Sequence, residues 1–152
     1  MSDQFKPISS NFEQRVIDSF NRQTAMKTVG ASIMQVSPGK VAIQFGFDSA
    51  LTQQHGFIHA GIVSTVLDSA CGYAAFSLMP DDAAVLTIEF KINLLSPAMG
   101  EWFEAIGRVK KPGRNITVTE GELYAHQGKD KKLVASMVGT MMAVFDREHI
   151  RN

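Results

Sequence analysis

The residues best suited to chemistry lie in a loop that leads into an apolar helical run, and they include Gln53, His59, Ala60 and Gly61. The first backbone N–H groups of a helix have no partner within the helix and lie at the positive end of its dipole. The N–H groups of Ala60 and Gly61 are therefore candidate donors to an oxyanion that develops during acyl transfer. His59 could orient the loop or donate a further bond, and Gln53 is either a site residue or a polar group of the loop.

Asp68 is a carboxylate within the same apolar run. Such a group needs a partner, access to solvent or a function. Burial raises the pKa of a carboxyl group, and a carboxylate with a raised pKa can act as a base or nucleophile near neutral pH. Taken alone, Asp68 could equally be a surface acid or a structurally paired acid, so its role depends on the surrounding pattern.

The spacing of Asp68 and His59 limits how the two can act together. Asp68 lies nine residues after His59, which in a helix is roughly 13 Å along the axis and about half a turn around it. One helix cannot present both groups to one small carbonyl. Two antiparallel copies related by a two-fold axis can. If both groups are catalytic, we expect at least a dimer, in which each site takes Asp68 from the other subunit.

The run that carries Asp68 has apolar residues at near-helical spacing from residue 60 to about residue 79, and many of them are small. This pattern predicts a buried helix that neighbouring backbone approaches closely. Pro80 is expected to end it.

Alternation of apolar and polar residues predicts six strands around this helix. Ile88, Phe90 and Ile92, for example, alternate with polar side chains. The predicted strands are residues 28–36, 40–47, 84–95, 101–110, 115–126 and 132–145, preceded by a helix to Arg22 that Asn11 would cap. Short turns between consecutive strands favour antiparallel pairing. The order predicts an α+β fold in which a six-stranded antiparallel sheet wraps one helix.

Length and composition exclude several classes of function. The 152 residues fit one domain, with residues 1–10 as a loose arm. Lys plus Arg and Asp plus Glu balance at 15 each, so no net charge attracts nucleic acid or an anionic membrane. The N-terminus is polar and no apolar run could span a bilayer, so we expect a cytoplasmic protein. The single cysteine, Cys71, excludes an intrachain disulfide, and no cluster has metal-ligand spacing.

The run Gln53-x-x-Gly56-x-x-His59-Ala60-Gly61, followed after six residues by Asp68, resembles the signature of PaaI-type hot-dog thioesterases. That signature reads Asn-x-x-Gly-x-x-His-Gly-Gly, with an acid at the same later spacing. The resemblance extends over about residues 28–145, because the strand order and the turn at residues 95–98 also fit.

The resemblance implies a role for each matching residue. Asp68 would be the general base or nucleophile, and the Ala60 N–H would polarise the thioester carbonyl. His59 would support the oxyanion loop, and Thr87 would assist the incoming water or thioester. This chain departs from the family in having Gln53 where Asn is usual, and Ala60 in place of the first Gly, although the backbone N–H of Ala60 is retained.

A basic turn at residues 110–115 contains Lys111 and Arg114. Coenzyme A carries a 3′-phosphate and a pyrophosphate, which exposed Arg and Lys side chains suit. Related thioesterases often bind the nucleotide end of coenzyme A near this turn. We assign Lys111 and Arg114 to that role, with a solvated hairpin as the alternative.

The sequence and this resemblance therefore predict a hot-dog thioesterase that hydrolyses acyl-CoA without a cofactor. The predicted assembly is at least a homodimer, with a dimer of dimers as the larger alternative. One alternative is a hot-dog hydratase or dehydratase, which would act on acyl thioesters without releasing free thiol. The other is an acyl-CoA binding module, which would bind the ligand without turnover.

Overall fold

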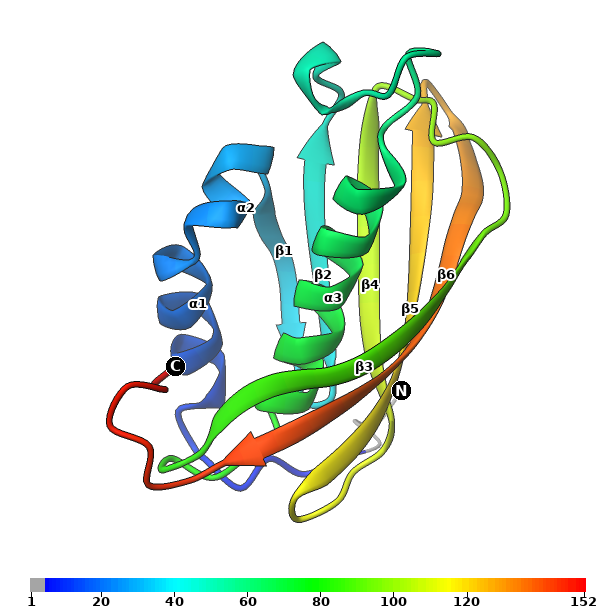
Figure 1. Cartoon of the computed structure of the whole chain (residues 1–152). Helices are drawn as coiled ribbons and strands as arrows, with labels where there is room; N and C mark the ends of the chain where they lie inside the picture. Colours follow the sequence, from blue (N-terminus) through cyan, green and yellow to red (C-terminus); the bar gives the residue numbers. More distant parts are fainter. Residues whose placement is uncertain (1–4) are drawn as a thin grey trace.

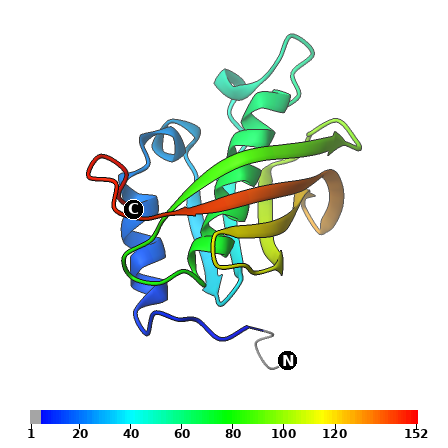
Figure 2. The same ribbon diagram turned by 60° about the horizontal axis from the view of Figure 1, so that its bottom comes forward.

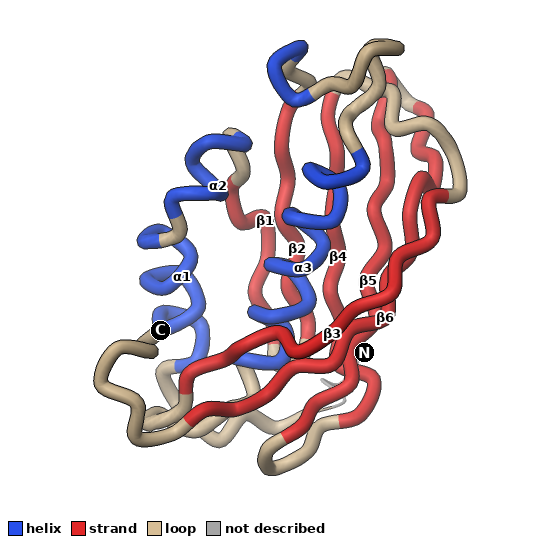
Figure 3. Tube along the Cα trace, viewed as in Figure 1, coloured by secondary structure: helices blue, strands red, loops and turns tan. Residues whose placement is uncertain are grey.

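The computed structural model describes residues 5–152, in which a six-stranded antiparallel sheet curls around one long helix (Figure 1). The helices are α1 (Phe12–Arg22), α2 (Thr24–Val29) and α3 (Ala60–Phe76), with a 3₁₀ turn η1 at Ser49–Leu51. The strands are β1 (Ser32–Ser37), β2 (Lys40–Gly46), β3 (Ala84–Leu94), β4 (Trp102–Lys111), β5 (Ile116–Gln127) and β6 (Asp130–Val144). Their order in the sheet is β1-β2-β4-β5-β6-β3, with β3 at an edge (Figure 3). The predicted hot-dog architecture is confirmed.

Strands β5 and β6 face α3 with every second residue over most of their length, as the sequence alternation predicts. In β5, Thr117, Thr119, Leu123 and Ala125 are buried, while Glu120 between them is exposed. The buried side chains of the strands and the apolar residues of α3 form one continuous core. The curl of the sheet therefore leaves the helix little contact with solvent along its C-terminal half.

Two glycines set how closely α3 approaches the sheet. Gly107 on β4 lies directly opposite Gly121 on β5. A Cβ atom at Gly107 would lie 2.3 Å from the carbonyl of Ala70, and one at Gly121 would lie 2.8 Å from the Cys71 sulfur. Only glycine permits so close an approach of helix to strand. The middle of α3 is therefore held at a fixed depth, two residues beyond Asp68.

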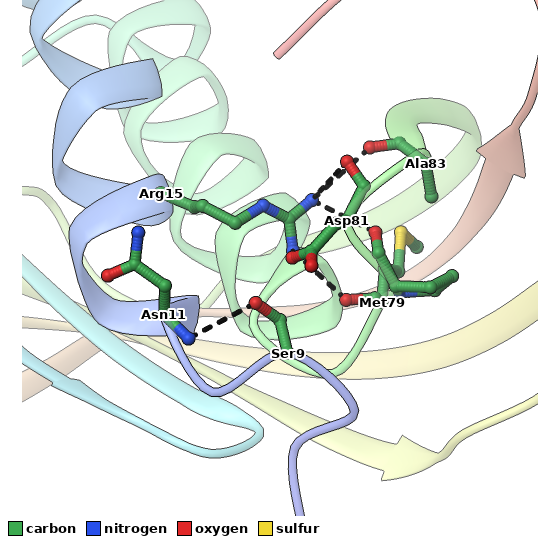
Figure 4. A network of polar contacts seen from close by, with 7 residues as sticks. Ser9, Asn11, Arg15, Met79, Asp81 and Ala83 are labelled. Atoms are coloured by element: carbon green, nitrogen blue, oxygen red, sulfur yellow. Dashed lines mark hydrogen bonds and ion pairs between the residues drawn. The ribbon is translucent and has the colours of Figure 1, made fainter.

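Arg15 of α1 fixes the other end of this helix (Figure 4). Its guanidinium donates to the carbonyl oxygens of Met79, at 3.1 Å, and Pro80, at 3.0 Å. It also lies 3.6 Å from the Asp81 carboxylate and 4.5 Å from the centre of the Phe76 ring. The carbonyl groups that follow α3 thus receive donors from α1 rather than from solvent.

The structure corrects three local predictions. Residues 28 and 29 belong to a short helix rather than to a strand, because Gly30 adopts the left-handed conformation (φ 73°) that ends α2 before β1 begins. Asn11 precedes α1 as predicted, but its side chain makes no cap, and its N–H donates to Ser9 Oγ at 3.2 Å. The regular part of α3 ends at Phe76, and single turns carry the chain on to Met79.

The predicted loose arm begins at residues 1–4, which lie outside the described residues. Within residues 5–10, Ser9 is buried and the Phe5 ring lies against the turn at Gly39, whereas Ile8 is 71% exposed. Among residues 5–152, no helix is both long enough and apolar enough to cross a membrane.

Candidate active site

The N-terminus of α3 presents one free backbone donor. His59 caps the helix, and its Nδ1 accepts a hydrogen bond from the Gly61 N–H at 2.8 Å. The Gly61 donor, which the sequence offered as a candidate for an oxyanion, is therefore engaged by His59 within this chain. In the part of the chain that the structure describes, no hydrogen bond uses the Ala60 N–H. Because Nδ1 of His59 accepts, the ring proton of the neutral imidazole lies on Nε2.

The loop before this helix is closed by its own hydrogen bonds. Gln53 accepts from the His55 N–H through its side-chain oxygen, and its backbone N–H donates to the Phe57 carbonyl at 2.9 Å. The Ile58 N–H donates to the Ala98 carbonyl at 3.0 Å, which ties the loop to the connection between β3 and β4. A pocket of about 270 Å³ lies between these segments, and Ala60 and Gln53 line it. We call it the Ala60 pocket.

Asp68 lies farther along α3 and forms a pair with Thr87 of β3. The Thr87 hydroxyl donates to Asp68 Oδ1 at 2.7 Å, and the Met141 sulfur lies 3.2 Å from the same hydroxyl. A hydroxyl carries one proton, and a carboxylate is a far stronger acceptor than a thioether. The pair therefore joins the central helix to the edge strand of the sheet.

Burial raises the pKa of Asp68 above its ordinary value, and the hydrogen bond from Thr87 offsets part of this effect. A carboxylate with a raised pKa is a stronger base than an exposed one, provided that it is ionised at the working pH. The neighbouring thiol of Cys71 has no such role, because burial raises its pKa to about 12.

A second pocket, of about 260 Å³, lies beside this carboxylate, and we call it the Asp68 pocket. Residues that the sequence did not single out form much of its wall, namely Gln23, Ser69, Gly72, Tyr73, Val85, Leu86 and Asn152. Gln23 comes from the junction of α1 and α2, and Asn152 from the C-terminal segment. No local pattern links positions so far apart in the chain, so only the folded structure reveals them.

The Ala60 pocket and the Asp68 pocket share no lining residue. Ala60 and Asp68 are eight residues apart on α3, which corresponds to about 12 Å along its axis. Within one chain, the structure brings Asp68 together with Thr87, and Ala60 together with Gln53 and His59. The candidate site is thus divided into two halves, as the helical geometry predicted.

The two predicted phosphate ligands lie near the other end of the molecule. Lys111 ends β4 and Arg114 follows in the turn to β5, and both side chains are exposed. Arg114 lines a cavity of about 1040 Å³ with Lys6 and with Leu78, just beyond the C-terminal end of α3. In Figure 1 this turn lies at the bottom, whereas α3 begins near the top.

Comparison with known proteins gives the family. The sequence model of the thioesterase superfamily matches residues 55–132. A crystal structure of a thioesterase family protein from Silicibacter pomeroyi is 55% identical, covers 89% of this chain and 99% of that chain, and has a TM-score of 0.88. An inferred esterase of Saccharolobus solfataricus is 26% identical over 140 residues, or 92% of each chain.

The E. coli PaaI protein from the phenylacetic acid degradation operon shares the fold, with 20% identity, a TM-score of 0.80, and coverage of 90% of this chain and 96% of that chain. The superfamily match and the esterase relatives support thioester hydrolysis as the general reaction. The chain belongs to the thioesterase superfamily.

Proposed function

We propose that this protein hydrolyses acyl-CoA thioesters at two equivalent sites, each shared by the two subunits of a homodimer. The observation that carries this proposal is the arrangement along α3, with a free N–H at Ala60 and a half-buried carboxylate at Asp68. These are the two groups that thioester hydrolysis needs, namely a donor to the oxyanion and a base or nucleophile. They are too far apart on one helix to meet one carbonyl.

In the proposed reaction, the thioester carbonyl oxygen accepts a hydrogen bond from Ala60 of the partner subunit. Asp68 takes a proton from water, the water oxygen bonds to the carbonyl carbon, and the C–S bond breaks to release the thiolate of coenzyme A. Thr87 holds the carboxylate in position through the 2.7 Å hydrogen bond. His59 orients the loop that presents Ala60, and Gln53 lines the pocket where the oxyanion would form.

The alternative covalent route starts from the same groups. Asp68 attacks the carbonyl carbon, forms an acyl anhydride and releases the thiolate, and water then hydrolyses the anhydride. A single turnover in ¹⁸O-labelled water tests for the covalent route. Label in the Asp68 carboxyl group supports the anhydride, whereas label in the product acid alone is expected both for direct attack by water and for an anhydride that water opens at its acyl carbon.

The free edge of β3 supports the homodimer. β3 is the last strand of the sheet and is 11 residues long. Its apolar residues are unusually exposed, with Ile88 at 50%, Phe90 at 42% and Leu94 at 55% (Figure 2 shows the strand lying beside β6). A long apolar edge strand pairs readily with a second chain. Antiparallel pairing of two β3 strands about a two-fold axis would also run the two α3 helices in opposite directions.

Lys111 and Arg114 complete the proposal as ligands of the coenzyme A phosphates. Both are exposed cations on one turn, and Arg114 lines the cavity beyond the C-terminal end of α3. A planar guanidinium can bind a phosphate through two parallel hydrogen bonds.

The direct test is release of free thiol from a panel of acyl-CoAs by the wild-type protein and by Asp68→Asn. The variant should lose about 10²–10⁴-fold in kcat, the range of a general acid or base, and should keep its quaternary structure. Asp130→Asn, an exposed acid at the start of β6, is the matched control. Near wild-type turnover in Asp68→Asn contradicts the proposal. Turnover that changes a double bond without releasing thiol would instead indicate a hydratase or dehydratase.

A further inference from the structure

The Asp68 pocket contains a glycine that packing does not explain. Gly72 lies one turn after Asp68 in the interior of α3, where glycine is less favourable than alanine. A Cβ atom at Gly72 would meet no neighbouring atom within 4 Å, unlike one at Gly107 or Gly121. Gly72 therefore keeps open a space next to the catalytic carboxylate.

A polar group with an unused donor faces the same pocket. Ser69 is buried, and its hydroxyl donates to Gln23 Oε1 at 2.9 Å. This bond fixes the amide of Gln23 through its oxygen. The Nε2 group of the same amide donates no hydrogen bond to any other group within residues 5–152. A primary amide that is held in place by its oxygen presents its N–H groups to whatever enters the pocket.

A network of hydrogen bonds holds the wall beyond Gln23. The Tyr73 hydroxyl lies 3.2 Å from Ser19 Oγ, and the amide nitrogen of Asn152 donates to the same Ser19 oxygen at 3.2 Å. The Asn152 side-chain oxygen accepts from the Val85 N–H at 2.9 Å. In Figures 1 and 2 the C-terminus accordingly lies against α1. This wall ties α1, α3 and β3 together on one side of the pocket.

The size of the pocket limits its occupant. Its volume of about 260 Å³ corresponds to roughly nine water-sized groups at about 30 Å³ each. An acyl group of several non-hydrogen atoms fills this volume, whereas a long alkyl chain would extend beyond it. The lining includes the apolar residues Gly72, Val85 and Leu86 and the polar side chain of Gln23.

We infer that the Asp68 pocket holds the acyl group, and that Gly72 and Gln23 select short acyl groups that carry a hydrogen-bond acceptor for the Gln23 amide. This inference rests on the proposed function. Gly72 provides the room for the acyl carbons, and the Gln23 amide donates to the acceptor. Both are specificity-determining residues, since neither one exchanges a proton or electrons with the thioester.

The first test compares acyl-CoAs that differ only at the far end. For chain lengths from three to eight carbons, each ω-hydroxyacyl-CoA is paired with the alkyl acyl-CoA that has a methyl group in place of the hydroxyl. At the length that reaches Gln23, the wild-type protein should prefer the hydroxyl compound by about fivefold in kcat/KM, as for one neutral hydrogen bond. Gln23→Leu should abolish the preference, and Gln14→Leu, on the exposed face of α1, should retain it.

The second test narrows the pocket. Gly72→Ala and Gly72→Val should lower kcat/KM progressively as the acyl chain lengthens, with the smallest effect on acetyl-CoA. The melting temperature of Gly72→Ala should be no lower than that of the wild type, because alanine favours the helix. Gly46→Ala is the control for a glycine-to-alanine change away from the pocket, because a Cβ atom at this position on β2 would meet no atom within 4 Å.

The outcomes separate this inference from the proposed function. The wild-type protein could hydrolyse acyl-CoAs while Gln23→Leu leaves the hydroxyl preference unchanged and Gly72→Val leaves the chain-length profile unchanged. That result would overturn the inference but not the proposed function. Failure of the wild-type protein to release thiol from any acyl-CoA overturns the proposed function, and the inference with it.

Discussion

The Thr87 hydroxyl donates to the Asp68 carboxylate across 2.7 Å, and this bond connects the central helix to the strand at the edge of the sheet. The acid is therefore held where a second subunit, joined through β3, would bring its own helix tip. One hydrogen bond thus relates the chemistry of the site to the proposed assembly.

Replacing Thr87 by valine keeps the volume of the side chain and removes this donor. The hydrogen bond lowers the pKa of Asp68, against the larger effect of burial. Without it, the pKa should rise further, and the acidic limb of the profile of kcat/KM against pH should move to higher pH. We expect kcat/KM at neutral pH to fall by about tenfold, as for one hydrogen bond to a charged group. An acidic limb at the wild-type position would show that Thr87 does not act on Asp68.

Asp68→Asn should make the protein more stable near neutral pH. Because the pKa of Asp68 is raised in the folded state, the folded protein binds more protons than the unfolded chain between the unfolded and folded pKa values. Stability therefore falls as pH rises through this window and stays lower above it. Asparagine cannot ionise, so the melting temperature of the variant should exceed that of the wild type at pH 7, and the difference should shrink at acidic pH. Equal melting temperatures of the two proteins at every pH would contradict the claim that burial of the ionised Asp68 carboxylate destabilises the folded protein.

Gly107→Ala should disrupt the packing of α3 on the sheet. The new methyl group would lie 2.3 Å from the Ala70 carbonyl and 2.5 Å from the Cys71 nitrogen, and backbone atoms cannot shift as the end of a flexible side chain can. We expect a loss of about 3 kcal/mol or more in the free energy of unfolding, measured by denaturant titration. The same change at Gly46, where no atom lies within 4 Å, should have a far smaller effect.

A charge at the free edge should prevent assembly. Phe90→Lys places an ammonium group on β3, where the ring is 42% exposed in the single chain. We expect light scattering to show a monomer, with at most about 1% of wild-type turnover, because each site would lose its partner half. Val138→Lys, at an apolar position of similar exposure on β6, is the control. A fully active monomer in the first variant would contradict the shared site.

The sequence predicted the extents of the strands well, because alternation of apolar and polar residues is a local property. Ile88, Phe90 and Ile92, for instance, lie within β3 as expected, but a register shift between Thr87 and Glu89 breaks the strict alternation, and Ile88 and Phe90 are exposed in the single chain. The six residues of α2 were not predicted, because so short a helix carries no periodic pattern and depends on the conformation of Gly30. The missing cap at Asn11 likewise depends on where Ser9 lies, which packing decides.

In the candidate site, too, the features that depend on local sequence were predicted, and those that depend on packing were not. The motif placed Ala60 at the tip of α3 and Asp68 along it, and helical geometry alone gave their separation. The walls of the Asp68 pocket could not be predicted, because Gln23 and Asn152 reach it only through the packing of α1 and the C-terminal segment. The engagement of the Gly61 N–H also required the position of the His59 ring.

The central claim, that each site joins Ala60 of one subunit to Asp68 of the other, can be tested with two inactive variants. Ala60→Pro removes the proposed oxyanion donor with little structural cost, because proline is favoured at the first position of a helix. His59 already has the extended conformation (φ −60°, ψ 138°) that a following proline requires. Ala60→Pro should lose about 10²–10³-fold in kcat, the effect of one oxyanion donor.

The decisive measurement is thiol release after Asp68→Asn and Ala60→Pro subunits are unfolded together and refolded as a mixture. Random pairing makes about half of the dimers mixed, and each mixed dimer has one intact site of its two, so activity should return to about a quarter of the wild-type value. If Ala60 and Asp68 act within the same chain, both sites of every mixed dimer are damaged. The mixture would then remain as inactive as its components, and that result would contradict a site shared between the two subunits.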